Sequence, residues 1–174
     1  MLSSTKFSYS MRPEDYAARP VPSLSEFYSL WAAWDTITQG MILREELSEK
    51  PIKLRNASVF YLGHIPTFLD IHLTRATNGK PTEPSYYQQM FERGIDPDVD
   101  NPEQCHAHSP IPDTWPPVEE ILDFQGRVRD RLAGLYKANA ADTDRKVARA
   151  LCLAFEVSDP RYRRGQKLAY SPKA

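Results

Sequence analysis

A single histidine inside an apolar stretch is the residue best placed to do chemistry. His64 lies in the sequence LGHIP (62–66), after Gly63, which lets a neighbouring backbone approach closely. Pro66 leaves the Leu62 carbonyl without its helical amide partner, so a local bend is expected beside the histidine. Neutral imidazole binds metal ions, and its pKa lies near physiological pH. The sequence therefore predicts a metal ligand or a general base at His64.

The structural alternative for His64 is a core histidine, hydrogen-bonded to a neighbouring helix or to the freed carbonyl. His72 lies on the same predicted helix, eight residues further along. At a rise of about 1.5 Å per residue the two side chains are about 12 Å apart along the axis. One mononuclear site cannot include both, so we expect His72 on the surface or in a groove.

Metal-binding residue types also occur in a long segment, 95–117, that is rich in proline and has no helical period. Cys105, His106 and His108 could bind zinc or copper, but zinc sites usually have wider, paired ligand spacing. We expect an ordinary loop there. The acidic run DPDVD (96–100) lacks the glycine and the closing glutamate of a calcium loop, so no calcium site is expected.

The elements that position these residues follow from the spacing of apolar side chains. Ser23 and Glu26 form a capping-box pattern, and Asn78 with Gly79 is typical of a helix end. The second helix is apolar almost all round, so it should be central. The predicted helices cover about 23–48, 57–78, 86–93, 117–135 and 142–155. With no strand predicted, the fold class is all-α: an antiparallel four-helix bundle with one extra short helix and a long loop.

Composition narrows the class of protein further. A chain of 174 residues predicts one domain, and a net charge of -1 does not favour nucleic-acid binding. No apolar run approaches the roughly 18 residues of a membrane span. Two cysteines and no visible leader predict a reduced, cytoplasmic setting.

Three segments are expected. Residues 1–22 read as a flexible N-terminal arm, 23–156 as the helical domain, and 157–174 as an aberrant basic tail without stable structure.

Residues from about 12 to 156 resemble the DinB-like helical domain of fungal ergothioneine-biosynthesis proteins, in their iron(II)-dependent sulfoxide synthase part. The motifs that carry this resemblance are 19–24 (RPVPSL), 30–35 (LWAAWD), 60–70 (FYLGHIPTFLD), 91–106 (FERGIDPDVDNPEQCH) and 115–122 (WPPVEEIL).

The resemblance implies an enzyme that binds one iron(II) through three histidines and joins the sulfur of cysteine to hercynine with dioxygen. Its first ligand corresponds to His64. The other two belong to a His-x-x-x-His-x-Glu motif directly after the segment matching 149–156, where this sequence continues with VSDPRYRRG. Two ligands and the family's C-terminal domain are therefore missing, and we expect a truncated domain that is inactive alone and does not hold iron stably.

Two alternatives stay open. The chain could be a stand-alone metal-binding bundle in which His64, His106 and His108 converge. It could also be a non-catalytic module that docks through an open apolar groove on a full-length homologue or on a separate catalytic domain.

Overall fold

The computed structural model describes residues 21–52, 55–98, 100–101, 104–110 and 112–158, without the side chains of 95–97 and 105–107. The predicted N-terminal arm up to residue 20 and the predicted tail from residue 159 lie outside the described residues. Val21, at the end of that arm, packs against the core.

Helices make up most of the described chain, which confirms the all-α class. In chain order the elements are α1 (Leu24–Asp35), the π-helix η2 (Thr36–Met41), the 3-10 helix η3 (Arg44–Ser48), α2 (Ser58–Thr77), α3 (Tyr87–Met90), β1 (Ile95–Pro97), β2 (Cys105–Ala107), α4 (Val118–Lys137), α5 (Ala140–Thr143) and α6 (Arg145–Ser158).

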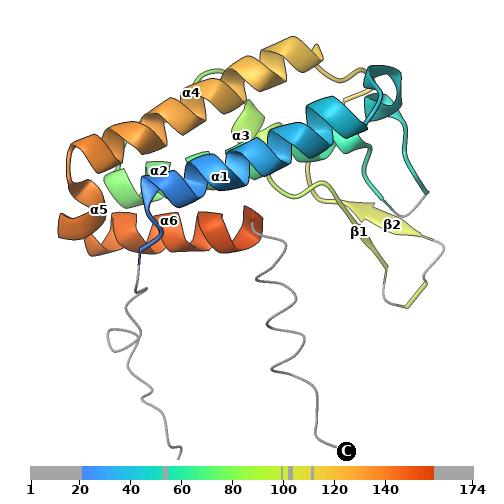
Figure 1. Ribbon diagram of the computed structural model, residues 1–174. Helices are drawn as coiled ribbons and strands as arrows, with labels where there is room; N and C mark the ends of the chain where they lie inside the picture. The colour runs from blue at the N-terminus through green and yellow to red at the C-terminus, as the bar shows by residue number, and fades with distance from the viewer. Residues whose placement is uncertain (1–20, 53–54, 99, 102–103, 111, 159–174) are drawn as a thin grey trace, which may run out of the picture.

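Helix α2 is central, with α4 along one side, α6 along the other and α1 across the front (Figure 1). The colour gradient shows that α1 and α6 run opposite to α2, whereas α4 runs in the same direction as α2. This differs from the antiparallel arrangement that we predict. The reason is the long connection 78–117, which returns the chain to the end where α2 begins before α4 starts.

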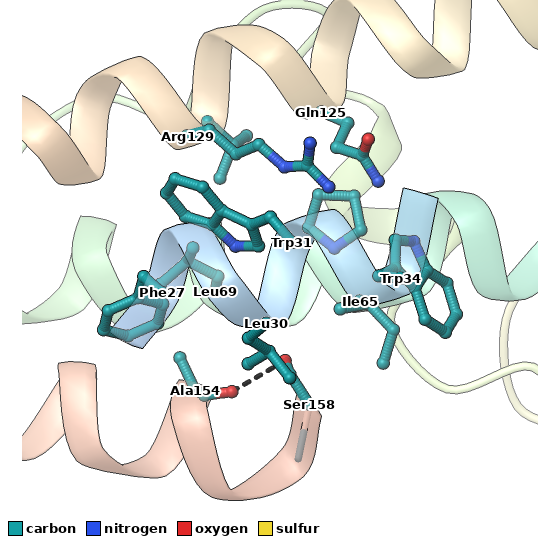
Figure 2. A pocket seen from close by; sticks show the side chains of 12 residues that line it. Phe27, Leu30, Trp31, Trp34, Ile65, Leu69, Gln125, Arg129, Ala154 and Ser158 are labelled. Carbon is teal, nitrogen blue, oxygen red and sulfur yellow. Dashed lines mark hydrogen bonds between the residues drawn. The ribbon is translucent and has the colours of Figure 1, made fainter. Parts of the chain in front are cut away.

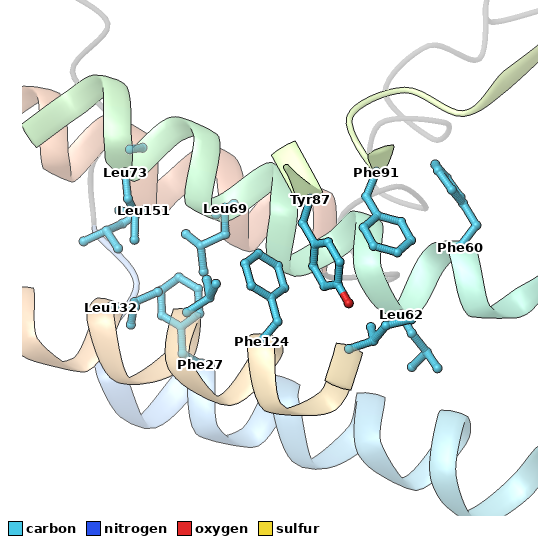
Figure 3. Packing of buried hydrophobic residues seen from close by; sticks show 14 of the residues in the cluster. Phe27, Phe60, Leu62, Leu69, Leu73, Tyr87, Phe91, Phe124, Leu132 and Leu151 are labelled. Carbon is cyan, nitrogen blue, oxygen red and sulfur yellow. The ribbon is translucent and has the colours of Figure 1, made fainter. Parts of the chain in front are cut away.

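The core is built on α2, which buries side chains on several faces as predicted. Figure 3 shows Leu69 and Leu73 of α2 beside Phe124 and Leu132 of α4, with Leu151 of α6 close by. Each such side chain removed from water contributes about 1.5–3 kcal/mol to folding. The apolar period on these helices therefore fixes α2 as the element that the others cover.

The first predicted helix is wrong in its second half. Instead of continuing to residue 48, α1 ends at Asp35 and is followed by the π-helix η2 and the separate 3-10 helix η3. Thr36 and Thr38 donate their hydroxyls to the carbonyls of Ala32 and Trp34, which competes with regular helical bonding. Ile42 then adopts an extended conformation and ends the helical run.

Helix ends follow the predicted signals in most places. The Ser23 and Glu26 capping box is present, and Asn78 ends α2 in the left-handed region at φ 49°. The start of the last helix is corrected, because Asp144 rather than residue 142 or 143 accepts from the amides of Lys146 and Val147. This helix runs to Ser158, two residues into the predicted tail.

The long loop contains secondary structure that the sequence does not predict. Strands β1 and β2 pair antiparallel, with Ile95 opposite Ala107. Gly94, at φ +72°, turns the chain into this hairpin, and the Ser109 hydroxyl accepts from the amides of Arg93 and Gly94. The hairpin is thereby fixed to the chain that follows α3.

Within the described part of the chain, none of the helices has both the length and the hydropathy needed to cross a membrane.

Candidate functional site

His64 lies in the first half of α2, half-buried, with its ring held on two sides. Its Nδ1 lies 2.7 Å from the backbone carbonyl of Phe91, and its ring stacks on Phe60 with centroids 5.1 Å apart. Because a carbonyl only accepts, Nδ1 carries the hydrogen, and in the neutral ring Nε2 carries the lone pair. No described residue forms a hydrogen bond with Nε2.

The structural alternative predicted for His64 therefore holds for the hydrogen bond, although the ring is half-buried and not fully in the core. Of the two predicted partners, the observed one is the neighbouring helix, through the C-cap residue of α3, and not the Leu62 carbonyl. Helix α2 continues through Pro66, which is buried within it. The observed bond leaves one ring nitrogen available, so the structural contact and a ligand role are compatible.

A cavity of about 470 Å³ is lined in part by His64. Most of its other lining is apolar and comes from α1, η2, α2 and the last residues of α6. The lining residues are Leu30, Ala33, Trp34, Ile37, Thr38, Ile42, Leu47, Ser58, Tyr61, His64, Ile65, Val157 and Ser158. The cavity is large enough for a small organic molecule.

The end of α6 forms part of this wall. Ser158 donates its hydroxyl to the Ala154 carbonyl at 2.8 Å, as the dashed line in Figure 2 marks. Figure 2 also shows Leu30, Trp34 and Ile65 facing Ser158 across a second, smaller cavity that shares these residues with the first. Val157 and Ser158 thus line the same cavity as His64, although more than 90 residues separate them from it in sequence.

Apolar side chains are exposed in the wall of the His64 cavity and in the segment between α1 and α2. Ile37 and Tyr61 line the cavity and are 46% and 36% exposed. Met41, Leu43 and Ile52, in the segment between α1 and α2, are each more than half exposed. Exposed apolar side chains are typical of an interface, and the predicted docking groove stays a prediction.

His72 lies elsewhere, in a groove of about 830 Å³ between the end of α2 and the start of α6. Its ring contacts Phe68, with centroids 4.4 Å apart. Burial lowers the pKa of His72, and the positive charge of Arg75 lowers it further. His72 and His64 thus line different cavities, in agreement with the separation predicted for them along the helix.

The second group of predicted metal-binding residues is described only in part. The side chains of Cys105 and His106 lie outside the described residues, and His108 is exposed. Their convergence with His64 stays a prediction. Among the side chains that the structure describes, no three of the histidine, cysteine, aspartate and glutamate type lie close enough to hold a metal ion together.

The acidic run serves a local turn. The Asp98 carboxylate accepts from the amides of Asp100 and Asn101, at 2.8 and 3.0 Å, which is the pattern of an aspartate-stabilised turn. The Asp98 carboxylate therefore has backbone partners in the loop between β1 and β2.

Sequence reasoning missed two parts of the site. The partner of His64 is the backbone carbonyl of Phe91, and a backbone group carries no residue-type signal. The approach of Val157 and Ser158 to the cavity depends on the direction of α6, which apolar periodicity does not give. The one usable signal was Gly63, whose missing side chain indicates a close neighbour.

A three-histidine iron site needs three imidazole ligands, and the described residues supply one of them, His64. His64 has the features of such a ligand, since its tautomer is fixed and its free nitrogen has no competing partner in the described structure. The other two donors are not among the described side chains.

Ergothioneine biosynthesis protein 1 of Neurospora crassa is 57% identical over 156 residues, which are 90% of this chain and 18% of that protein. Ergothioneine biosynthesis protein 1 of Schizosaccharomyces pombe is 36% identical over 108 residues, which are 62% of this chain and 14% of that protein. No family model matches the chain. No solved structure matches it significantly.

The chain thus spans less than one-fifth of the length of either relative. Both matches carry the same name, and the longer one includes most of the described residues. Over nine-tenths of its length, the chain is similar to one segment of ergothioneine biosynthesis protein 1.

Proposed function

We propose that this chain is the DinB-like helical part of an ergothioneine biosynthesis protein and supplies His64 as one of three ligands of a catalytic iron(II). In that role it takes part in a sulfoxide synthase, with hercynine, cysteine and dioxygen as substrates. The 57% identity to a segment of the Neurospora crassa protein supports the pathway.

One observation carries the assignment of the site: the end of α6 and His64 line the same cavity. The motif that supplies the other two histidines in the resembling family follows directly after the segment matching 149–156. Val157 and Ser158, the next residues of this chain, lie in the wall of the His64 cavity. A chain that continued with that motif would bring its ligands to His64.

The described residues suit a ligand role at His64 in two further respects. The Phe91 carbonyl and the Phe60 ring fix the imidazole, so little entropy is lost when Nε2 binds a metal ion. The walls of the cavity are mostly apolar, and an apolar surrounding strengthens electrostatic interactions. Iron(II), when bound, would supply the activation of dioxygen for carbon–sulfur bond formation.

The chain alone is proposed to be inactive. One imidazole does not hold iron(II) against water, whereas three facial ligands fix the ion and leave positions for substrates. We further propose a cytoplasmic location, consistent with the low number of cysteines, two in 174 residues.

A chimera tests the proposal. In it, the 156 matched residues of this chain replace the corresponding segment of the Neurospora crassa protein, so that the relative supplies everything else. We expect the chimera to convert hercynine and cysteine to the sulfoxide. His64→Ala should abolish this conversion, while the matched control His72→Ala should retain it.

Two results would contradict this proposal. Full conversion by the His64→Ala chimera would remove the ligand role. Conversion by the purified chain itself, with iron(II) and oxygen, would show that it needs no further ligands.

The exposed apolar side chains in the segment between α1 and α2 favour a second candidate function, a module that docks on a full-length homologue. Met41, at 73% exposure, is the most exposed of them. If this function holds, the chain should co-elute with the Neurospora crassa protein in size-exclusion chromatography, and Met41→Lys should weaken the complex. Separate elution at micromolar concentrations would exclude it.

A further inference from the structure

We propose that Gly63 and Phe91 are positioning residues for His64. Gly63 admits the Phe91 ring against α2, and the Phe91 carbonyl then holds the hydrogen on Nδ1, so that the lone pair is on Nε2. The link to iron rests on the proposed function, whereas the control of the tautomer stands on the geometry of this chain alone.

The contact between Gly63 and Phe91 leaves no room for a side chain. A Cβ atom built on Gly63 would lie 2.6 Å from three ring carbons of Phe91, well inside van der Waals contact. Glycine inside a helix costs roughly 0.5–1 kcal/mol relative to alanine, so its presence here needs a packing reason. The Phe91 ring supplies that reason.

The Phe91 ring cannot withdraw easily from this contact. It is fully buried, and it packs edge-on against Tyr87 at 5.0 Å and stacks on Trp115 at 5.8 Å. Figure 3 shows the Tyr87 and Phe91 rings side by side next to α2. An added methyl group at position 63 would therefore move the Phe91 segment and not only its ring.

The Phe91 carbonyl is likewise held in a fixed direction. The Phe91 amide donates to the Tyr87 carbonyl at 2.9 Å, and the next residues are tied to Ser109 through the amides of Arg93 and Gly94. A Cβ at Gly94 would lie 2.7 Å from the Phe60 ring, so this turn also fits closely against α2. The acceptor for His64 is part of the packed structure.

The chemical consequence concerns which nitrogen can bind a metal ion. In an unconstrained neutral imidazole the hydrogen resides mainly on Nε2, which would block that nitrogen. The 2.7 Å bond to Phe91 reverses this preference. Displacing the carbonyl would return the hydrogen to Nε2.

The first test is the tautomer of His64 in the full chain, measured by ¹⁵N NMR above pH 8, where imidazole is neutral. The His64 signals are identified by their loss in His64→Gln. We expect an Nδ1-protonated ring in the unchanged chain and a mixture dominated by the Nε2-protonated ring in Gly63→Ala. Gly134→Ala is the matched control, because a Cβ on this α4 glycine meets nothing within 4 Å.

A second variant keeps the test decisive if Gly63→Ala does not fold. Phe91→Leu retains the backbone carbonyl but removes the ring that crowds position 63, so Gly63→Ala combined with Phe91→Leu should fold. Because the clash is relieved and the carbonyl kept, we expect the Nδ1-protonated form of His64 to return in this double variant. An Nδ1-protonated His64 that persists in a folded Gly63→Ala, or a folded double variant that lacks the Nδ1-protonated form, would overturn the proposal.

Iron affinity in the chimera tests the link to the metal. Loss of the outer partner of a ligating histidine typically lowers metal affinity 10- to 100-fold, so Gly63→Ala should weaken iron(II) binding by about that factor. An unchanged affinity would overturn the positioning role toward iron. If instead His64→Ala leaves iron binding intact, the proposed function fails, while the NMR result still decides whether Phe91 sets the tautomer.

Discussion

His64 and His72 show how two histidines on one helix acquire different properties. His64 has a carbonyl partner and a stacked ring, whereas His72 faces Arg75 and a basic groove. Burial and the Arg75 charge both penalise protonated His72, which lowers its pKa from the ordinary value of 6.5. The lowered pKa of His72 makes the stability of the folded chain depend on pH.

The stability of the chain should fall below pH 6.5 partly because of His72. A lowered pKa in the folded state means that the unfolded chain binds the proton more readily, so this contribution to stability is complete above 6.5 and declines as pH falls. His72→Gln should therefore lose less stability between pH 7 and pH 5 than the unchanged chain. Urea midpoints at the two pH values measure this; equal losses would contradict it.

Asp70 is the buried charge on which the structure most depends. Its carboxylate has no exposed surface and accepts from Arg131 at 2.7 Å, from Gln88 at 2.8 Å and from the amide and hydroxyl of Thr82. These bonds tie the connection after α2 to both α2 and α4.

Removing the Asp70 carboxylate should destabilise the folded chain. Asp70→Ala leaves several donors without an acceptor, and we expect the free energy of unfolding to fall by about 3 kcal/mol. Asp35→Ala is the matched control, because Asp35 pairs with Arg129 but has 35% of its side chain exposed, and its loss should cost about 1 kcal/mol or less. Urea denaturation measures both, and similar losses for the two variants would contradict the ranking.

At the scale of elements, local signals determine where helices begin and end. The α1 capping box joins the Ser23 amide to Glu26 at 2.7 Å and the Glu26 amide to Ser23 at 3.3 Å. Ser23→Ala should destabilise the chain by about 1 kcal/mol. Ser29→Ala, inside the same helix, should be neutral or slightly stabilising since alanine has the higher helix propensity. Thermal unfolding measures both variants. Equal stabilities of Ser23→Ala and Ser29→Ala would contradict a role for the capping box.

Elements fixed by tertiary contacts could not be predicted in this way. The capping box and the Asn78 end lie in short sequence patterns, so they were predictable. At the π-helix η2, the hydroxyls of Thr36 and Thr38 donate to backbone carbonyls one turn earlier. The β1–β2 pairing joins residues across a loop. Neither the π-helix nor the strand pairing produces a periodic apolar pattern in the sequence.

At the scale of the whole molecule, the path of the connection 78–117 decides the architecture. It lets α4 run in the same direction as α2 and carries Phe91 to His64. The central position of α2 was predictable, because apolar coverage is a local property. The residue type of His64 and its neighbours marked it as a candidate, and its ligand role stays a prediction. The cavity could not be predicted, since its walls come from residues 30–65 and from the end of α6.

The central claim is that His64 binds iron, and the iron content of the chimera tests it most directly. The chimera would be purified without an affinity tag, loaded with iron(II) under anaerobic conditions, and analysed with its His64→Ala and His72→Ala forms. We predict one iron per chain in the chimera and in His72→Ala, and loss of iron in a folded His64→Ala. One iron per chain in His64→Ala would contradict the account.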